Sequence, residues 1–264
     1  MSAVPIVRKQ NVKEKDTMLE IFFELHEDLA QQGPGSDEYT RKAFSLTQPL
    51  SPKSRILDLG CGPGRQTIEL AKLSKGEIHA VDNHKPYIEE LRIRTMKARV
   101  TEKIKTHVGS MDDLNFAEES FDLIWSEGAI YSIGFEKGLK LWRRFLKPGC
   151  YIAVTEVSWL KSDLPEELRN YWNVAYPDIG SIGDNIRRVE QAEFELAATL
   201  TLPASTWWDG YYTQILERME VLNKKYADDE TARKVFDEEK REIEMFRRYS
   251  DYYSYVFYIA KRPL

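Results

Sequence analysis

One stretch constrains the fold more than any other. It runs from Ile56 to Thr67 and reads Ile-Leu-Asp-Leu-Gly-Cys-Gly-Pro-Gly-Arg-Gln-Thr. A short apolar run leads into three glycines at every second position, and helical apolar spacing starts at once with Ile68. This order predicts a strand, a tight turn and a helix. Glycine reaches positive φ angles and leaves the backbone bare, and a helix start presents unpaired N–H groups. The stretch therefore predicts a nucleotide-type ligand site.

The glycine spacing discriminates between possible ligands. Dinucleotide-binding turns have the fingerprint G-x-G-x-x-G. Here the spacing is G-x-G-x-G, one residue shorter, and Asp58 stands two places before the first glycine. An NAD-dependent enzyme would share the strand-turn-helix arrangement but would need the longer fingerprint, so it is the less favoured reading.

A second acid supports a nucleoside ligand. The segment Glu77–Asp82 reads as a short strand and ends in an acid 24 residues beyond Asp58. A carboxylate at the end of the second strand of a βαβ unit can accept hydrogen bonds from both ribose hydroxyls. We therefore expect Asp82 to bind a ribose.

Length and composition narrow the class. The 264 residues suffice for one large domain or a domain with an added subdomain. A net charge of −5 argues against a general nucleic-acid surface, which needs clustered Lys and Arg. The two cysteines lie far apart and predict neither a metal site nor a disulfide framework. No apolar run reaches the length of a membrane helix, and we expect a cytoplasmic protein.

The segment from Asp58 to Gly64 resembles the first motif of the class I methyltransferases that use S-adenosylmethionine. The Leu-Lys-Pro-Gly stretch at 146–149, followed by an apolar strand, is also similar to that family, although Cys150 stands where a second glycine is usual. The resemblance implies a Rossmann-like α/β fold with a seven-stranded, mostly parallel sheet and helices on both faces. It also implies an antiparallel last strand, expected at 252–261.

The resemblance further implies which residues meet the cofactor. The glycine turn would lie against its methionine end, Asp82 against the ribose, and the loop after the third strand against the adenine. The expected cofactor-binding residues are Asp58, Gly60, Gly62, Gly64, Gln66, Asp82, Asn83, Ser110, Met111, Asp112, Ser126 and Glu127.

The loop after the fourth expected strand contains the catalytic candidates. Ligands of open parallel sheets bind beyond the carboxyl ends of the strands, where this loop should lie. Glu127 and Tyr131 are the candidates, and the alternative for Glu127 is a helix cap or a surface acid. The implied reaction is an in-line displacement that needs alignment more than a base. If the nucleophile has a proton to lose, Glu127, Glu156 or a tyrosine could accept it.

The chain divides into three expected parts. Residues 1–50 would form an N-terminal helical cap, residues 51–205 with 250–264 the cofactor-binding domain, and residues 206–249 an inserted helical lid. The helices before the first strand could line the site or could only pack on the sheet. The lid is the largest departure from the family pattern, because about 50 residues replace a short hairpin.

Aromatic residues are frequent where the site should be covered. We expect the substrate to meet Tyr39, Tyr131, Trp159, Trp207 and Tyr211, although each of them could instead be a packing residue. An aromatic-lined pocket suits a small planar, apolar or cationic acceptor. The branch looks like the small-molecule methyltransferases, similar to the ubiquinone/menaquinone types. An RNA or protein methyltransferase and a non-catalytic cofactor-binding module are the alternatives.

Overall fold

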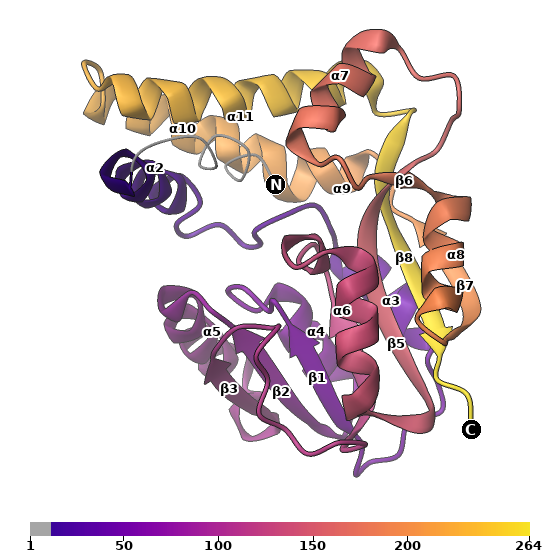
Figure 1. Cartoon of the computed structure of the whole chain (residues 1–264). Helices are drawn as coiled ribbons and strands as arrows, with labels where there is room; N and C mark the ends of the chain where they lie inside the picture. The colour runs from indigo at the N-terminus through magenta and orange to yellow at the C-terminus, as the bar shows by residue number, and fades with distance from the viewer. Residues whose placement is uncertain (1–11) are drawn as a thin grey trace.

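A mixed β-sheet passes through the whole molecule, as the computed structural model of residues 12–264 shows (Figure 1). Seven strands lie in the order β3-β2-β1-β4-β5-β8-β7, and the two-residue strand β6 pairs with β5 off this path. The strands are β1 Arg55–Leu59, β2 Glu77–Asp82, β3 Ile104–Val108, β4 Phe121–Ser126, β5 Leu146–Trp159, β6 Gly180–Ser181, β7 Glu195–Thr201 and β8 Tyr253–Lys261.

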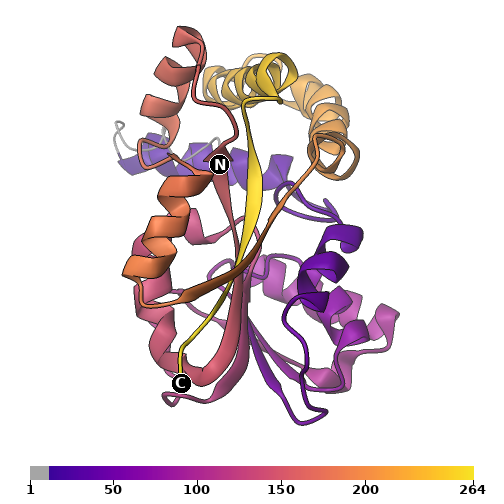
Figure 2. The same ribbon diagram turned by 90° about the vertical axis from the view of Figure 1, so that its right-hand side faces the viewer.

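The strand directions confirm the predicted fold class. Strands β3, β2, β1, β4 and β5 are mutually parallel, whereas β8 is antiparallel to both β5 and β7. The central strands are short apolar runs buried on both faces, as parallel strands between two helical layers must be. Strand β5 is the apolar strand expected after the Leu-Lys-Pro-Gly stretch, and β8 pairs with it from Tyr151 to Trp159 (Figure 2).

Two helical layers cover the sheet. Helices α3 (Asp37–Ser45), α4 (Arg65–Leu73) and α5 (Lys85–Ala98) pack on one face. Helices α6 (Phe135–Trp142) and α8 (Ile182–Gln191) pack on the other. Short 3₁₀ turns lie at Thr101–Lys103 (η1), Ile130–Ser132 (η2) and Arg143–Phe145 (η3). The layers place the glycine turn, between β1 and α4, at the carboxyl edge of the sheet.

Further helices lie beyond that carboxyl edge (Figure 1). They are α2 (Val12–Leu25), α7 (Glu166–Ala175), α9 (Ser205–Trp207), α10 (Thr213–Lys225) and α11 (Glu230–Tyr249), with a π-helical turn η4 at Trp208–Tyr212. Helix α2 contacts both α10 and α11. The first 11 residues of the expected 1–50 cap lie outside the described part of the chain. Within residues 12–264, no helix is both long and apolar enough to cross a membrane.

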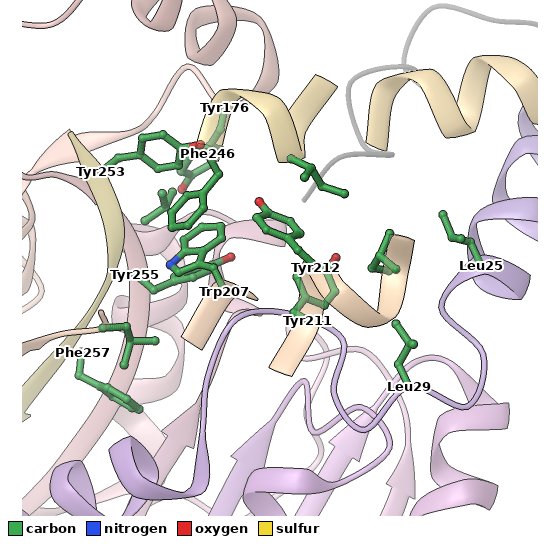
Figure 3. Close-up of a cluster of buried hydrophobic side chains, with 14 of the residues drawn as sticks. Leu25, Leu29, Tyr176, Trp207, Tyr211, Tyr212, Phe246, Tyr253, Tyr255 and Phe257 are labelled. Carbon is green, nitrogen blue, oxygen red and sulfur yellow. The ribbon is translucent and has the colours of Figure 1, made fainter. Parts of the chain in front are cut away.

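Aromatic side chains dominate the core between the sheet and these helices. Trp207 lies between Phe246 of α11 and Tyr255 of β8, with ring centroids 4.3 and 5.3 Å away (Figure 3). Tyr211 and Tyr212 are fully buried in the same cluster. Segments 206–249 and β8 therefore share one core with the sheet.

Candidate active site

The three glycines of the turn have left-handed backbone conformations, and they differ in what surrounds them. Gly60, Gly62 and Gly64 have φ angles of 70, 52 and 93°. A Cβ on Gly60 would lie 2.2 Å from the Cβ of Ala129, and one on Gly64 would lie 2.1 Å from Cδ1 of Leu91. Packing therefore requires glycine at both positions. At Gly62 the nearest atom would be 3.5 Å away, so this glycine keeps the turn open toward a cavity.

Asp58 lies beneath the turn. Its side chain is fully buried, and Thr67 Oγ1 donates a hydrogen bond of 2.6 Å to Oδ2. Oδ1 has no hydrogen-bond partner among the described residues. Burial raises the pKa of the carboxyl to about 7, against the lowering effect of Thr67. Through this hydrogen bond, Asp58 links β1 to the first turn of α4.

Asp82 is held rigidly at the wall of the cavity. Its Oδ2 accepts a hydrogen bond of 2.9 Å from the Gly62 amide, and its Oδ1 accepts one of 2.8 Å from the His84 amide. Burial raises the pKa of this carboxyl. Each carboxylate oxygen has a second lone pair, so Asp82 can still accept two hydrogen bonds from a ligand.

A cavity of about 230 Å³ lies over the turn. Its floor is the glycine turn with Asp82, and its opposite side comes from segment 31–34 and helix α2. An adjoining cavity of about 260 Å³ shares Asp82, Asn83 and Met111 with it. Ser110 and Asp112 line only this second cavity, on its rim, where Ser110 Oγ donates to Asp112 Oδ1 at 2.5 Å.

Glu127 forms a buried polar cluster at the cavity wall. Arg65 Nη2 lies 2.6 Å from Oε2, while Thr40 Oγ1 and Trp125 Nε1 donate to Oε1 at 2.8 and 2.9 Å. The Glu127 side chain is only 5% exposed. It is therefore neither a helix cap nor a surface acid, because one ion pair and two donated hydrogen bonds hold its carboxylate in place. Asp37 also pairs with Arg65, at 3.1 Å.

A third cavity, of only about 10 Å³, adjoins the first and shares Gln32, Gly33, Pro34, Gly128 and Tyr131 with it. We call it the aromatic box. Its remaining wall residues are Trp172, Trp207, Tyr211, Glu242 and Tyr255.

A buried histidine on α2 orients one wall of the aromatic box. His26 Nδ1 lies 2.8 Å from the Phe22 carbonyl, and Nε2 lies 3.1 Å from the Tyr211 hydroxyl. A carbonyl can only accept, so Nδ1 has the proton, and the Tyr211 hydroxyl donates to Nε2. Burial lowers the pKa of His26 to about 3 and keeps the ring neutral.

The structure brings most predicted site residues to these cavities, but not all. Tyr131, Trp207 and Tyr211 line the aromatic box, and Gly60, Gly62, Gln66, Asp82, Asn83, Met111 and Glu127 line the first cavity. Five others do not line the three cavities: Asp58, Gly64, Ser126, Tyr39 and Trp159.

Three of these five have identifiable packing tasks. Ser126 Oγ donates to the Leu59 carbonyl at 2.8 Å, between β4 and β1. Tyr39 lies on α3 with the Lys42 ammonium 4.5 Å from its ring centroid. Trp159 packs edge-to-face against Trp172.

Several wall residues were not expected from the sequence. Arg65 directly follows the glycine turn, and this position alone makes it a candidate for the cavity wall. Tyr255 alternates with Tyr253 along β8, which signals one aromatic face. Glu242 gave no signal, because it lies in a strongly charged helix that reads as solvated.

Comparison with known proteins identifies the family. A family model described as a methyltransferase domain matches residues 50–235, which is most of the chain. The chain belongs to this methyltransferase domain family. The predicted resemblance is thereby confirmed.

Individual relatives of this methyltransferase domain are distant. A dimethylglycine N-methyltransferase from Parasynechococcus marenigrum is 31% identical over 119 residues, which cover 44% of this chain and 42% of the relative. A sterol 24-C-methyltransferase from Gibberella zeae is 27% identical over 116 residues, covering 44% and 30%. The chain thus spans less than half the length of these curated relatives.

Solved structures agree with the fold over nearly the whole chain. A methyltransferase from Geobacter sulfurreducens in complex with S-adenosyl-L-homocysteine has a TM-score of 0.79 at 16% identity, covering 92% of this chain and 98% of its own. A second one, from Thiobacillus denitrificans, has a TM-score of 0.79 at 18% identity, with the same coverage. At such identities the likeness shows the fold alone.

Proposed function

We propose that this protein transfers a methyl group from S-adenosylmethionine to a small-molecule acceptor. The observation that supports this most directly is the Asp82 carboxylate, fixed by two backbone amides beside the open face of Gly62. A nucleoside ligand needs such an acceptor for its ribose hydroxyls, and its other end needs bare backbone. The residues present therefore fit the cofactor that the family uses.

The proposed cofactor contacts divide between the two larger cavities. Asp82 would accept the ribose hydroxyls, and the backbone at Gly60 and Gly62 would lie against the amino-acid end. Asn83 and Met111 would flank the adenine, because they line both cavities. Ser110 and Asp112, on the rim of the second cavity, would face its amine edge. When bound, the cofactor's sulfonium supplies an activated methyl group, so the protein needs to align the acceptor and exclude water.

Glu127 is assigned a positioning role rather than that of a base. Arg65, Thr40 and Trp125 together occupy its carboxylate oxygens, so these oxygens are already engaged within the protein. Its charge at the cavity wall would stabilise a cationic cofactor. Tyr131, which lines both the first cavity and the aromatic box, is the residue best placed to touch cofactor and acceptor.

Glu156 has little scope as a base. It is fully buried and lines none of the three cavities. Burial raises its pKa to about 8, against the lowering effect of the Tyr176 hydroxyl. We therefore favour an acceptor whose attacking atom needs no protein base.

The aromatic box, of only about 10 Å³, is far too narrow for a nucleotide base, which supports a compact acceptor group. The chain's net charge of −5 also disfavours RNA. We further propose a cytoplasmic location, because Cys61 and Cys150 are free thiols, as is usual in a reducing compartment.

Calorimetry and mass spectrometry test the proposal. S-Adenosylmethionine should bind the wild-type protein, NADH should not, and Asp82→Asn should weaken cofactor binding. A panel of small acceptors should then yield S-adenosylhomocysteine and a product heavier by one methylene. Preferential binding of NADH would refute the cofactor assignment. Tight cofactor binding without turnover on any acceptor would indicate a non-catalytic module.

A further inference from the structure

We propose that the aromatic box binds the cationic head group of an amine acceptor, with Glu242 as its counter-ion. This inference rests on the proposed methyl-transfer function and specifies its substrate class. It depends on the burial of one carboxylate on α11, on the side chains around it and on its connection to the first cavity.

The Glu242 carboxylate is buried, and the described side chains offer it no cation. The residue is 5% exposed, and the Tyr212 hydroxyl donates to Oε1 at 3.1 Å. Among the side chains of residues 16–264, no Lys, Arg or His nitrogen forms an ion pair with it, and the Tyr212 hydroxyl is its hydrogen-bond donor. Removing a carboxylate from water without a partner is unfavourable. Among the described side chains, the Glu242 carboxylate therefore has no cationic partner.

Neighbouring basic residues on α11 are engaged elsewhere. Lys240 lies 3.7 Å from Asp237, and Arg241 lies 3.9 Å from Glu238, with its guanidinium over the ring of Tyr171. Further along the helix, Arg247 lies 2.6 Å from Glu244, and Arg248 lies 2.6 Å from Glu167. None of these cations supplies the charge missing beside Glu242.

The other walls of the box suit a cation. Tyr131, Trp172, Tyr211 and Tyr255 line it together with Glu242, whereas Trp207, which also lines it, is stacked between Phe246 and Tyr255. The faces of aromatic rings attract cations, more strongly when water is excluded, and aromatic cages bind alkylated ammonium groups in this way. An uncharged apolar ligand would gain from the rings but would leave the carboxylate unpaired.

The size and position of the box limit the ligand. Its free volume of about 10 Å³ holds about one water molecule, so the head group must be compact and segment 32–34 must shift to admit it. Gly128 and Tyr131 line both the box and the first cavity. A Cβ on Gly128 would meet no atom within 4 Å, so its backbone is open to a ligand. An acceptor held at the box can thus extend toward the cofactor.

Paired probes and paired variants test the inference. The probes are choline and its neutral carbon isostere 3,3-dimethyl-1-butanol, titrated by calorimetry into protein saturated with S-adenosylhomocysteine. The variants are Glu242→Gln, which keeps an acceptor for Tyr212, and the control Glu244→Gln, which removes the same charge from the exposed side of α11.

The expected result is discrimination by charge. Choline should bind wild type and Glu244→Gln at least about tenfold more tightly than the isostere does, and Glu242→Gln should remove that preference. Affinity for S-adenosylhomocysteine should stay unchanged in both variants. If the isostere binds as well as choline, or Glu242→Gln retains the preference, the inference is wrong. If wild type does not bind S-adenosylhomocysteine, the proposed function itself fails, which is a different outcome.

Discussion

His26 makes the stability of the protein depend on pH in a way that can be calculated. Burial of its ring lowers the pKa from an ordinary 6.5 to about 3. The unfolded chain therefore binds one more proton than the folded protein between these values. Stability from neutral His26 is present above pH 6.5 and is lost as the pH falls. One pKa unit corresponds to about 1.4 kcal/mol, so lowering the pH from about 8 to about 4.5 should cost about 2.7 kcal/mol.

Other buried groups titrate over the same range with the opposite sign. Burial raises the pKa of Asp58 to about 7 and that of Glu156 to about 8. Their protonation therefore favours the folded state as the pH falls. The wild-type profile alone is a sum of these effects, so His26 must be isolated by difference.

The assay is urea unfolding of wild type and His26→Gln at several pH values from about 8 to about 4.5. Glutamine is uncharged and can still accept the hydrogen bond from Tyr211. The variant will be less stable at every pH, but the gap should shrink by about 2.7 kcal/mol toward the acid end. A gap that does not change with pH would refute the assignment of a neutral, buried His26.

Three further substitutions probe the cavity wall. Gly60→Ala should lower the free energy of unfolding by about 1–2 kcal/mol through its left-handed φ and by about 1–3 kcal/mol through the clash with Ala129. Adding Ala129→Gly should recover only the part due to the clash. Thermal unfolding measures both variants. Asp82→Asn should raise the cofactor Kd by roughly 10- to 100-fold in calorimetry, because it replaces charged hydrogen bonds with neutral ones, while a smaller change would argue against ribose binding. Arg65→Leu should destabilise the fold by about 3–5 kcal/mol, because it leaves the buried Glu127 charge unpaired. Adding Glu127→Gln to Arg65→Leu should restore most of this lost stability. A double variant as unstable as Arg65→Leu would contradict the pairing of Arg65 with Glu127.

Local patterns in the sequence were sufficient for the parts of the fold that short segments determine. The glycine spacing predicted the strand, the turn and the helix that follow one another from Arg55 to Leu73. The same reasoning could not find the partners of Glu127, because Thr40 and Arg65 come from α3 and α4, far away in the chain. It also overlooked Glu242, since only tertiary packing distinguishes one buried acid from the exposed acids around it.

Segment 32–34 should couple the binding of the cofactor to the binding of the acceptor. Gln32, Gly33 and Pro34 line both the first cavity and the aromatic box, so one stretch of backbone borders two ligands. A ligand that orders this stretch lowers the conformational-entropy cost of binding the second ligand. By thermodynamic linkage, each ligand then increases the affinity for the other by the same factor. Cofactor and acceptor should therefore strengthen each other's binding, and an acceptor measured against the cofactor-free protein will appear weaker than it is during turnover.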